Sequence, residues 1–302
     1  MEVLYWLESI RVPFLTELML LITRLGEETA FLVAALIVFW CLDKNRGYYL
    51  MAVGFCGTIL NQFLKLLCKI PRPWVLDRGF NAVEEAIPAA NGYSFPSGHS
   101  QSSVGVFGGL AMTTKQKVLR WIFVVIAVLV PFSRMYLGVH TPADVLVGSL
   151  SALALVFLFR FVNEGKYIQP MLLGMAGLSV AYLIFAQFII DPSNMDSYNY
   201  THGVQNAYTL MGAVFGMVVV FFVDEKYIHF QVKAVWWAQI LKVVGGAVLV
   251  LLVKTGLKMP LNSLFGEYPG RAIRYFLMVL VAGCVWPLTF RWFASLGKKE
   301  HP

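Results

Sequence analysis

Apolar residues run along this chain in long blocks, and short groups of charged residues separate the blocks. A helix needs roughly 17–25 apolar residues to cross a bilayer core that is about 30 Å thick. The first block is short, and we expect it to recruit Glu27 and Glu28 at its mouth. The predicted fold is an all-α polytopic membrane bundle of about nine spans, at residues 29–42, 48–67, 99–114, 118–132, 143–161, 170–190, 207–223, 238–253 and 273–290.

The first 25 residues break this pattern, because charged residues recur among the apolar ones. The spacing of Trp6, Phe14, Leu18 and Leu21 suits an amphipathic helix that lies in the membrane interface. A full span is the alternative for this segment. A basic start followed by a clean apolar stretch is missing, so we expect no cleavable signal peptide.

Composition agrees with a membrane protein and excludes an ordinary soluble domain. The chain is 58% hydrophobic and 14% charged, with a mean hydropathy of +0.68. Its net charge of +7 follows the positive-inside rule, because alternate loops carry the basic residues, and we place those loops in the cytoplasm. The charge therefore needs no nucleic-acid partner. These loop residues are Lys44, Arg46, Lys115, Lys117, Arg120, Arg160, Lys166, Lys226, Lys233, Arg291, Lys298 and Lys299.

Two groups of basic residues fall on the opposite side and violate the rule. Lys254, Lys258, Arg271 and Arg274 surround the last connection, and we hypothesise that they attract an anionic headgroup or contact anionic lipid. The other group follows the second and fourth spans, where further polar residues accompany it. It consists of Lys65, Lys69, Arg72, Arg78 and Arg134.

Three polar strings lie at the non-cytoplasmic ends of four consecutive spans, at residues 65–73, 96–99 and 133–144. Helix hairpins bring these ends to one membrane face. They collect three strong cations, two histidines, a carboxylate and a Ser-Gly turn at a helix start. Cations beside helix N-terminal N–H groups form an anion site that fits phosphate. The histidines supply the nucleophile and the proton donor that cleavage of a phosphate ester needs.

These strings resemble the signature of the type-2 phosphatidic acid phosphatase superfamily, which also includes vanadium haloperoxidases and glucose-6-phosphatases. The signature reads Lys-x(6)-Arg-Pro, then Pro-Ser-Gly-His, then Ser-Arg-x(5)-His-x(3)-Asp, and the resemblance covers residues 48–161. Three motifs in order with these spacings are very specific. The matching residues are Lys65, Arg72, Pro73, Pro96, Ser97, Gly98, His99, Ser133, Arg134, His140 and Asp144.

The resemblance implies a role for each matched residue. His140 is the expected nucleophile, and His99 is the general acid that protonates the leaving group. Asp144 holds the imidazole of His140, because Thr141 reads as an N-cap with Pro142 at the first helical position. Simple helix capping is the alternative role for this carboxylate. The expected phosphate-binding residues are Lys65, Arg72, Ser97, Gly98 and Arg134.

The resulting functional hypothesis is a phosphatase in the cell membrane that cleaves a lipid phosphomonoester or diphosphate at the non-cytoplasmic face through a phosphohistidine. A phosphotransferase, a sugar-phosphate phosphatase and a non-catalytic binder or transporter are the alternatives. Expected partners are the lipid phosphate and membrane lipids, with no nucleic acid, cofactor or metal; the oligomeric state stays open. Residues 1–166 form the expected phosphatase core, and residues 167–302 add transmembrane helices of unassigned role.

The remaining reactive residue types are expected to be structural. The cysteines Cys41, Cys56, Cys68 and Cys284 lack metal-ligand spacing and are predicted to be small buried hydrophobes. We assign the same structural role to the remaining histidines, and we expect the loop at residues 74–93 to border the site entrance. Those histidines are His202, His229 and His301.

Overall fold

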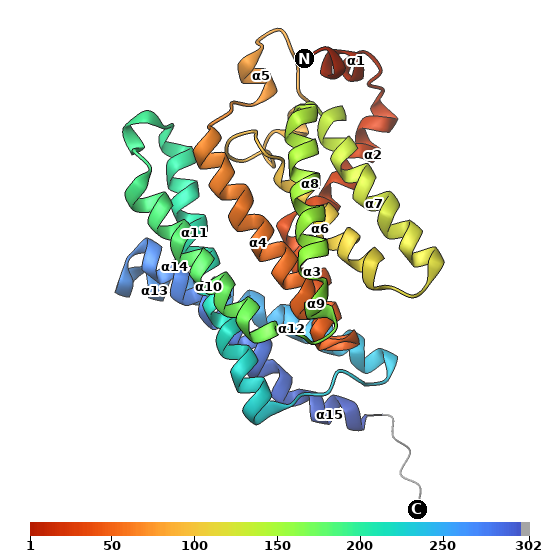
Figure 1. The fold of residues 1–302 in the computed structure, drawn as a ribbon, viewed down its shortest axis with the longest axis vertical. Coiled ribbons are helices and arrows are strands. Elements are labelled where there is room, and N and C mark those ends of the chain that lie inside the picture. The colour runs from red at the N-terminus through yellow and green to blue at the C-terminus, as the bar shows by residue number, and fades with distance from the viewer. Residues whose placement is uncertain (297–302) are drawn as a thin grey trace, which may run out of the picture.

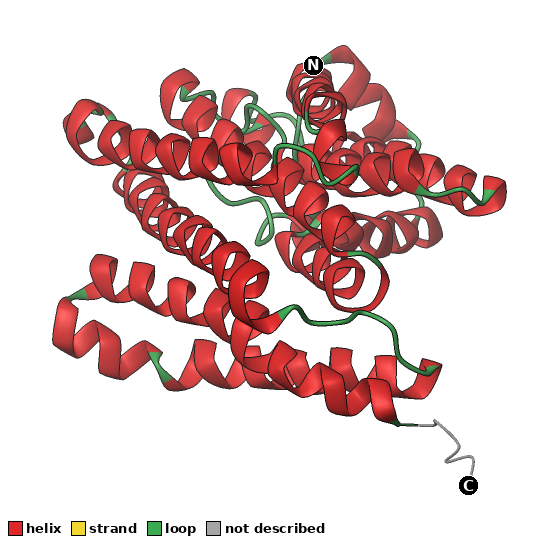
Figure 2. Cartoon of the chain, turned by 60° about the horizontal axis from the view of Figure 1, so that its bottom comes forward, coloured by secondary structure: helices red, strands yellow, loops and turns green. Residues whose placement is uncertain are grey.

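A computed structural model describes residues 1–296 of the chain, leaving aside the side chain of Asn194; Lys298, Lys299 and His301 lie outside this range. Helices and connecting loops make up the described residues, with no strand among them (Figure 2). The helices are α1 (Glu2–Ser9), α2 (Pro13–Thr23), α3 (Glu28–Ile37), α4 (Lys44–Cys68), α5 (Pro73–Leu76), α6 (Gly98–Thr113), α7 (Lys117–Tyr136), α8 (Pro142–Leu158), α9 (Arg160–Asn163), α10 (Ile168–Ile184), α11 (Ser197–Val223), α12 (Trp236–Gly256), α13 (Lys258–Phe265), α14 (Glu267–Leu280) and α15 (Phe290–Ser295).

Side-chain caps fix where three helices of the N-terminal half begin. Asp43 accepts from the backbone N–H of Arg46 at the start of α4, and Ser97 accepts from that of Ser100 at the start of α6. Thr141 and Asp144 form a reciprocal capping box at the start of α8, with Pro142 in the first turn. The predicted N-cap at Thr141 is confirmed.

The central helix of the bundle is α4, whose buried side chains run along most of its length. It contacts α6 and α8 on one side and α10 and α11 on the other (Figure 1). One apolar core joins residues of the first half, such as Trp40 and Tyr49, to residues of the second half, such as Val214 and Phe290. The two halves of the chain therefore share a continuous core.

Among residues 1–296, six helices are long and apolar enough to cross a membrane. The number rises to seven if residues 13–26 and 28–42, which are bent by 55°, count as one broken span. The apolar helix α8 is shorter, and α6 has 16 residues. Each of the nine predicted spans coincides with a helix, but the count of nine is not confirmed.

Two further predictions concern single residue types. Cys56 is buried as predicted, whereas Cys68 is exposed at the end of α4, because the helix stops there and the chain turns through Lys69 in a left-handed conformation (φ 51°). In the C-terminal half, Arg271 donates from Nε to the hydroxyl of Thr209 (2.7 Å), and Arg274 is buried. The membrane role expected for these two arginines stays a hypothesis.

Candidate active site

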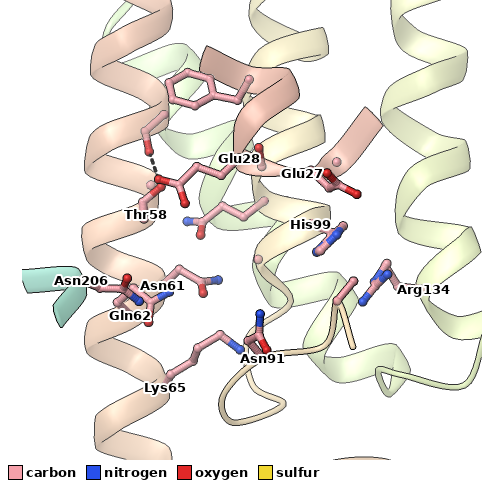
Figure 3. Close-up of a pocket in the computed structure, with 18 of the residues that line it drawn as sticks. Glu27, Glu28, Thr58, Asn61, Gln62, Lys65, Asn91, His99, Arg134 and Asn206 are labelled. Atoms are coloured by element: carbon pink, nitrogen blue, oxygen red, sulfur yellow. Dashed lines mark hydrogen bonds between the residues drawn. The ribbon is translucent and has the colours of Figure 1, made fainter. Parts of the chain in front are cut away.

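A cavity of about 580 Å³ lies between α3, α4, α6, α7 and α11. Five of the predicted site residues with basic side chains line it, and Gly98 lines it as well. Residues 88, 89 and 91, from the loop that was expected to border the entrance, also contribute to its wall. The five basic residues are Lys65, Arg72, His99, Arg134 and His140 (Figure 3 shows three of them with labels).

His140 is buried between Arg72 and Asp144. Its Nε2 lies 2.9 Å from Nη1 of Arg72, and its Nδ1 lies 3.5 Å from Oδ2 of Asp144. A guanidinium can only donate, so Nε2 must accept, which assigns the ring proton to Nδ1 on the Asp144 side. The separation of 3.5 Å is long for a hydrogen bond, as is common in ligand-free catalytic sites. This arrangement directs the lone pair of Nε2 at Arg72, from which it accepts a hydrogen bond.

The surroundings of His140 also favour its neutral form. Burial lowers the pKa of His140 well below its ordinary range, and the guanidinium groups of Arg72 and Arg134 lower it further. A neutral imidazole has a free lone pair, whereas a protonated one has none. His140 is thus held in the state that can act as a nucleophile.

Asp144 combines both roles considered for it. Its Oδ2 accepts from the Thr141 backbone N–H (2.8 Å) and from the hydroxyl of Ser94 (2.6 Å), and the same oxygen faces His140. The capping interaction and the contact with the imidazole therefore coexist. The hydrogen bond from Ser94 ties the loop before α6 to the start of α8.

Arg134 is completely buried, and only part of its guanidinium is satisfied. Nη1 donates to the hydroxyl of Thr23 in α2 (2.8 Å), whereas Nε and Nη2 have no hydrogen-bond partner among the described residues. Nε and Nη2 form one edge of the guanidinium, and such an edge binds two oxygens of a phosphate. Thr23 thus fixes one corner of Arg134, and the edge formed by Nε and Nη2 is left without a partner among the described residues.

Arg72 and Lys65 hold the loop that follows α4. Arg72 donates to the carbonyl oxygens of Asn91 (2.7 Å), Gly92 (3.0 Å) and Val139 (3.0 Å). Lys65 donates from Nζ to the carbonyl oxygen of Tyr93. Both cations therefore fix the loop backbone while they line the cavity.

His99, Ser97 and Gly98 lie at the start of α6. Nε2 of His99 has no hydrogen-bond partner among residues 1–296, and the ring lies beside Arg134 on one side of the cavity (Figure 3). Ser97 is committed elsewhere: its N–H donates to the Asp144 carbonyl (2.9 Å), and its hydroxyl accepts from the hydroxyl of Ser100 (2.8 Å). Gly98, and not Ser97, reaches the cavity wall at the helix N-terminus.

Gly26 lets the N-terminal segment approach the site. A Cβ at this position would lie 2.6 Å from Val130 and 3.0 Å from the carbonyl oxygen of His99. Any larger residue would push the short turn between α2 and α3 away from α6. Close contact here places Glu27 in the cavity wall beside His99.

Several cavity residues had no signal in the sequence motifs. His202, expected to be structural, lines the cavity from α11. The others come from α2–α3, α4, α6 and α11, and only the packing of those helices brings them together. They are Glu27, Glu28, Thr58, Asn61, Gln62, Gln101, Ser102 and Asn206.

The site as a whole is suited to an anion. Three basic side chains and two histidines meet there, and three of their polar atoms (Nε and Nη2 of Arg134 and Nε2 of His99) have no partner in the described residues, whereas Nδ1 of His140 faces Asp144. Buried donors left unsatisfied are costly, so a ligand that accepts from them gains much of its affinity from this arrangement. A tetrahedral phosphate has the oxygens to do so.

Comparison with known proteins gives two family matches. A family model described as the PAP2 superfamily matches residues 45–166, and one for the transmembrane extension of PAP2 superfamily phosphatases matches residues 208–299. The undecaprenyl-diphosphatase BcrC of Bacillus subtilis is 31% identical over 139 residues, which are 45% of this chain and 68% of that protein. Phosphatidylglycerophosphatase B of Bacillus subtilis is 33% identical over 168 residues, which are 51% of this chain and 78% of that protein.

A solved structure also aligns with the chain. The crystal structure of a transmembrane PAP2-type phosphatidylglycerolphosphate phosphatase from Bacillus subtilis has 31% sequence identity to it. The alignment covers 55% of this chain and 84% of that chain, with a TM-score of 0.46.

Proposed function

Because this chain belongs to the PAP2 superfamily, we propose that it hydrolyses the phosphate ester of a membrane lipid through a phosphohistidine on His140. Membership makes it a membrane phosphatase, a phosphoric ester hydrolase with transmembrane helices. The substrate, the covalent intermediate and the membrane side are our proposal. The observation that carries it is the convergence of unpartnered donors from Arg134 and His99 on the cavity in which His140 presents Nε2.

In the first step, Nε2 of His140 attacks phosphorus and forms a P–N bond while the bond to the leaving oxygen breaks. His99 gives its proton to that oxygen, which departs as the alcohol. Lys65, Arg72 and the open edge of Arg134 hold the three equatorial oxygens, together with the N-terminus of α6 at Gly98. Asp144 stabilises the imidazolium that forms on His140.

In the second step, water attacks the phosphohistidine. His99, now neutral, takes a proton from that water as the P–N bond breaks, and inorganic phosphate leaves. The same residue thus serves as acid and then as base, as microscopic reversibility requires. The cations supply the charge stabilisation of both steps, so we propose that neither step needs a metal or a cofactor.

We propose further that the cavity opens at the non-cytoplasmic face of the cell membrane, because the basic loops lie at the opposite ends of the helices. In this topology all nine predicted segments cross the membrane, with α6 and α8 as short spans in the bundle, and α1 and α2 lie in the interface. Residues 1–166 then form the catalytic core, and residues 167–302 form the extension.

Phosphate release from purified protein tests the proposal. The panel is phosphatidylglycerophosphate, phosphatidate, a polyprenyl diphosphate and a sugar phosphate, each with and without chelator, and with an alcohol acceptor to detect transfer. His140→Ala abolishes release and any trapped phosphoenzyme, whereas His99→Ala costs about 10²–10⁴-fold on a lipid ester and much less on nitrophenyl phosphate.

His229→Asn is the matched control, because Asn tolerates the left-handed backbone of His229 (φ 49°), which lies outside the cavity wall. We expect this variant to behave like the unaltered protein. A phosphoenzyme in His140→Ala, or activity that needs an added divalent ion, would refute the mechanism. Release from the sugar phosphate alone, or transfer to the alcohol in place of hydrolysis, would favour one of the alternatives.

A further inference from the structure

The cavity contains polar side chains that the phosphate chemistry does not use. Glu27 and Glu28 lie at the break between α2 and α3, where the helix axis bends by 55°. Figure 3 shows both on one side of the cavity, with Lys65 and Asn91 on the other. Irregular backbone is tolerated where it lines a polar cavity, so this break between the interfacial α2 and the first span is compatible with a binding site.

The amide side chains of the cavity fall into two kinds. Two of them are already hydrogen-bonded within the protein: Asn61 donates to the Pro96 carbonyl (3.2 Å), and Gln101 donates to the Ser151 hydroxyl (3.0 Å). Gln62 and Asn206 make no side-chain hydrogen bond within the described range, and they lie close together beside Asn61 (Figure 3).

The two carboxylates are also uncommitted. Neither Glu27 nor Glu28 makes a side-chain hydrogen bond or an ion pair within 4.0 Å to any residue in the range 1–296. Arg134 lies in the same cavity, fully buried, with Nε and Nη2 unpartnered. The cavity therefore presents hydrogen-bond donors that suit a phosphate. It also presents carboxylates and amides that suit a second, different chemical group.

The charges of the cavity residues indicate which chemical group the carboxylates and amides bind. Glu27 and Glu28 share the cavity wall with Lys65, Arg72 and Arg134, and Figure 3 shows Glu27 beside His99. A second, negatively charged phosphate in this cavity would lie against these carboxylates, which disfavours it. Carboxylates only accept hydrogen bonds, and amides both accept and donate, so together they match hydroxyl groups.

Building on the phosphatase function proposed above, we propose that Glu28, Gln62 and Asn206 form a subsite for hydroxyl groups of the alcohol that carries the scissile phosphate. The preferred substrates are then phosphomonoesters of hydroxyl-bearing alcohols, and diphosphates are disfavoured. A hydroxyl that donates to Glu28 and accepts from an amide makes two hydrogen bonds in this wall, one of them to a charged group. A substrate that lacks the hydroxyl forgoes both bonds and leaves the exposed Glu28 and the half-buried amides to water.

The subsite combines both halves of the chain. Gln62 lies on α4 within the catalytic core, Glu28 begins α3, and Asn206 lies on α11 near the start of the extension. His202, one turn before Asn206 on α11, continues the same wall and packs against the ring of Tyr198 (4.7 Å between ring centroids, planes tilted by 52°). The extension therefore has a role in substrate choice in addition to packing.

The test compares kcat/KM for substrates that differ by one hydroxyl. One pair is phosphatidylglycerophosphate and its analogue without the free glycerol hydroxyl; the water-soluble pair is propane-1,2-diol 1-phosphate and propyl phosphate. A polyprenyl diphosphate completes the set. We expect the hydroxyl to raise kcat/KM about 10- to 100-fold, below the 10⁴–10⁵-fold seen where a closed site is built around one hydroxyl, because water reaches Glu28 when the hydroxyl is missing. If the lipid pair shows the preference and the soluble pair is not cleaved, the hydroxyl belongs to a lipid headgroup.

Two variants, Glu28→Leu and Asn206→Leu, are made separately, so that one remains if the other fails to fold. Each is expected to lower the ratio of kcat/KM for the substrate with the hydroxyl to kcat/KM for the substrate without it toward one. Thr58→Val is the matched control, because Thr58 lines the same cavity but donates its hydroxyl to the Gly54 carbonyl of its own helix (3.0 Å). It leaves the ratio unchanged. An unaltered ratio in both leucine variants, or a preference of the unaltered protein for the diphosphate, overturns the subsite while phosphate release still supports the phosphatase function. No release from any substrate overturns both proposals.

Discussion

Arg134 and Lys242 are fully buried cations that lie in different regions of the bundle and have very different partners. Lys242, on α12, donates to the carbonyl oxygens of Trp40 (2.8 Å) and Val232 (3.0 Å), and its ammonium lies 4.1 Å from the centre of the Phe290 ring. Arg134, on α7, has a single partner in Thr23 and two unpartnered nitrogens. A buried cation with satisfied donors stabilises the structure, whereas one with open donors is prepared for a ligand.

The largest expected effect separates these two cations directly. Arg134→Gln removes the open donor edge and lowers kcat/KM by about 10²–10³-fold, as the loss of one transition-state donor does. Lys242→Met removes the donor to the buried Trp40 carbonyl, which costs about 1–3 kcal/mol of stability, whereas the Val232 carbonyl keeps its hydrogen bond from Gln239 (2.8 Å); kcat/KM is unchanged. Steady-state kinetics and thermal unfolding in detergent measure both. The comparison fails if Lys242→Met loses activity at a temperature where it remains folded.

Thr23 gives a smaller and more specific effect. Thr23→Val removes the acceptor for Nη1 of Arg134, and a hydrogen bond to a charged group is worth ~1.5–3 kcal/mol, which corresponds to about 10- to 100-fold in kcat/KM. Vanadate, a transition-state mimic, binds more weakly by a similar factor, and Thr23→Ser restores its affinity. Thr23 is a positioning residue in this account.

Thr209→Val is the matched control for Thr23→Val, because Thr209 accepts from Arg271 (2.7 Å) outside the cavity wall. Its loss of stability is expected to be similar, and its vanadate affinity unchanged. Equal weakening of vanadate binding in both valine variants would mean that Thr23 has only a structural role.

The smallest effect is on the pH profile. Because burial and the two arginines lower the pKa of His140, its neutral form persists below its ordinary range, and the acid limb of kcat/KM lies below about pH 6.5. Phosphoenzyme formation from nitrophenyl phosphate between pH 5 and 8 measures this limb, after division by the substrate's own ionisation in the same buffers. A corrected limb at pH 6.5 or above contradicts the proposed neutral state of His140.

The sequence predicted the elements whose signals are local. One example is the start of α8, where the cap Thr141, Pro142 in the first turn and Asp144 all lie within four residues. Their geometry therefore follows from the rules for helix starts alone. The helices that carry the motifs were likewise predicted from apolar blocks of sufficient length. Ser97 shows what such local signals do not predict. Its position at the start of α6 was predicted, but its hydrogen bonds with Asp144 and Ser100 were not.

The remaining residues of the cavity depend on tertiary packing. Thr23 meets Arg134 across 111 positions of sequence because α2 packs against α7, and no pattern near Thr23 indicates this contact. Asn206 reaches the wall because α11 packs on α4. Single polar residues in apolar helices indicate a function, but the sequence of one chain does not specify which partners they meet.

The bonds of Asp144 have a consequence for the order in which the protein is made. The loop before α6 is held from the start of α8, since Ser94 donates to the Asp144 carboxylate and the N–H of Ser97 donates to its carbonyl. A growing chain that has already delivered α4 and α6 to the bilayer still lacks this anchor and His140. Under the mechanism proposed above, biosynthesis therefore passes through a stage in which half-made molecules share the membrane with phosphorylated lipids and are inert toward them, and activity begins only when α8 has been inserted.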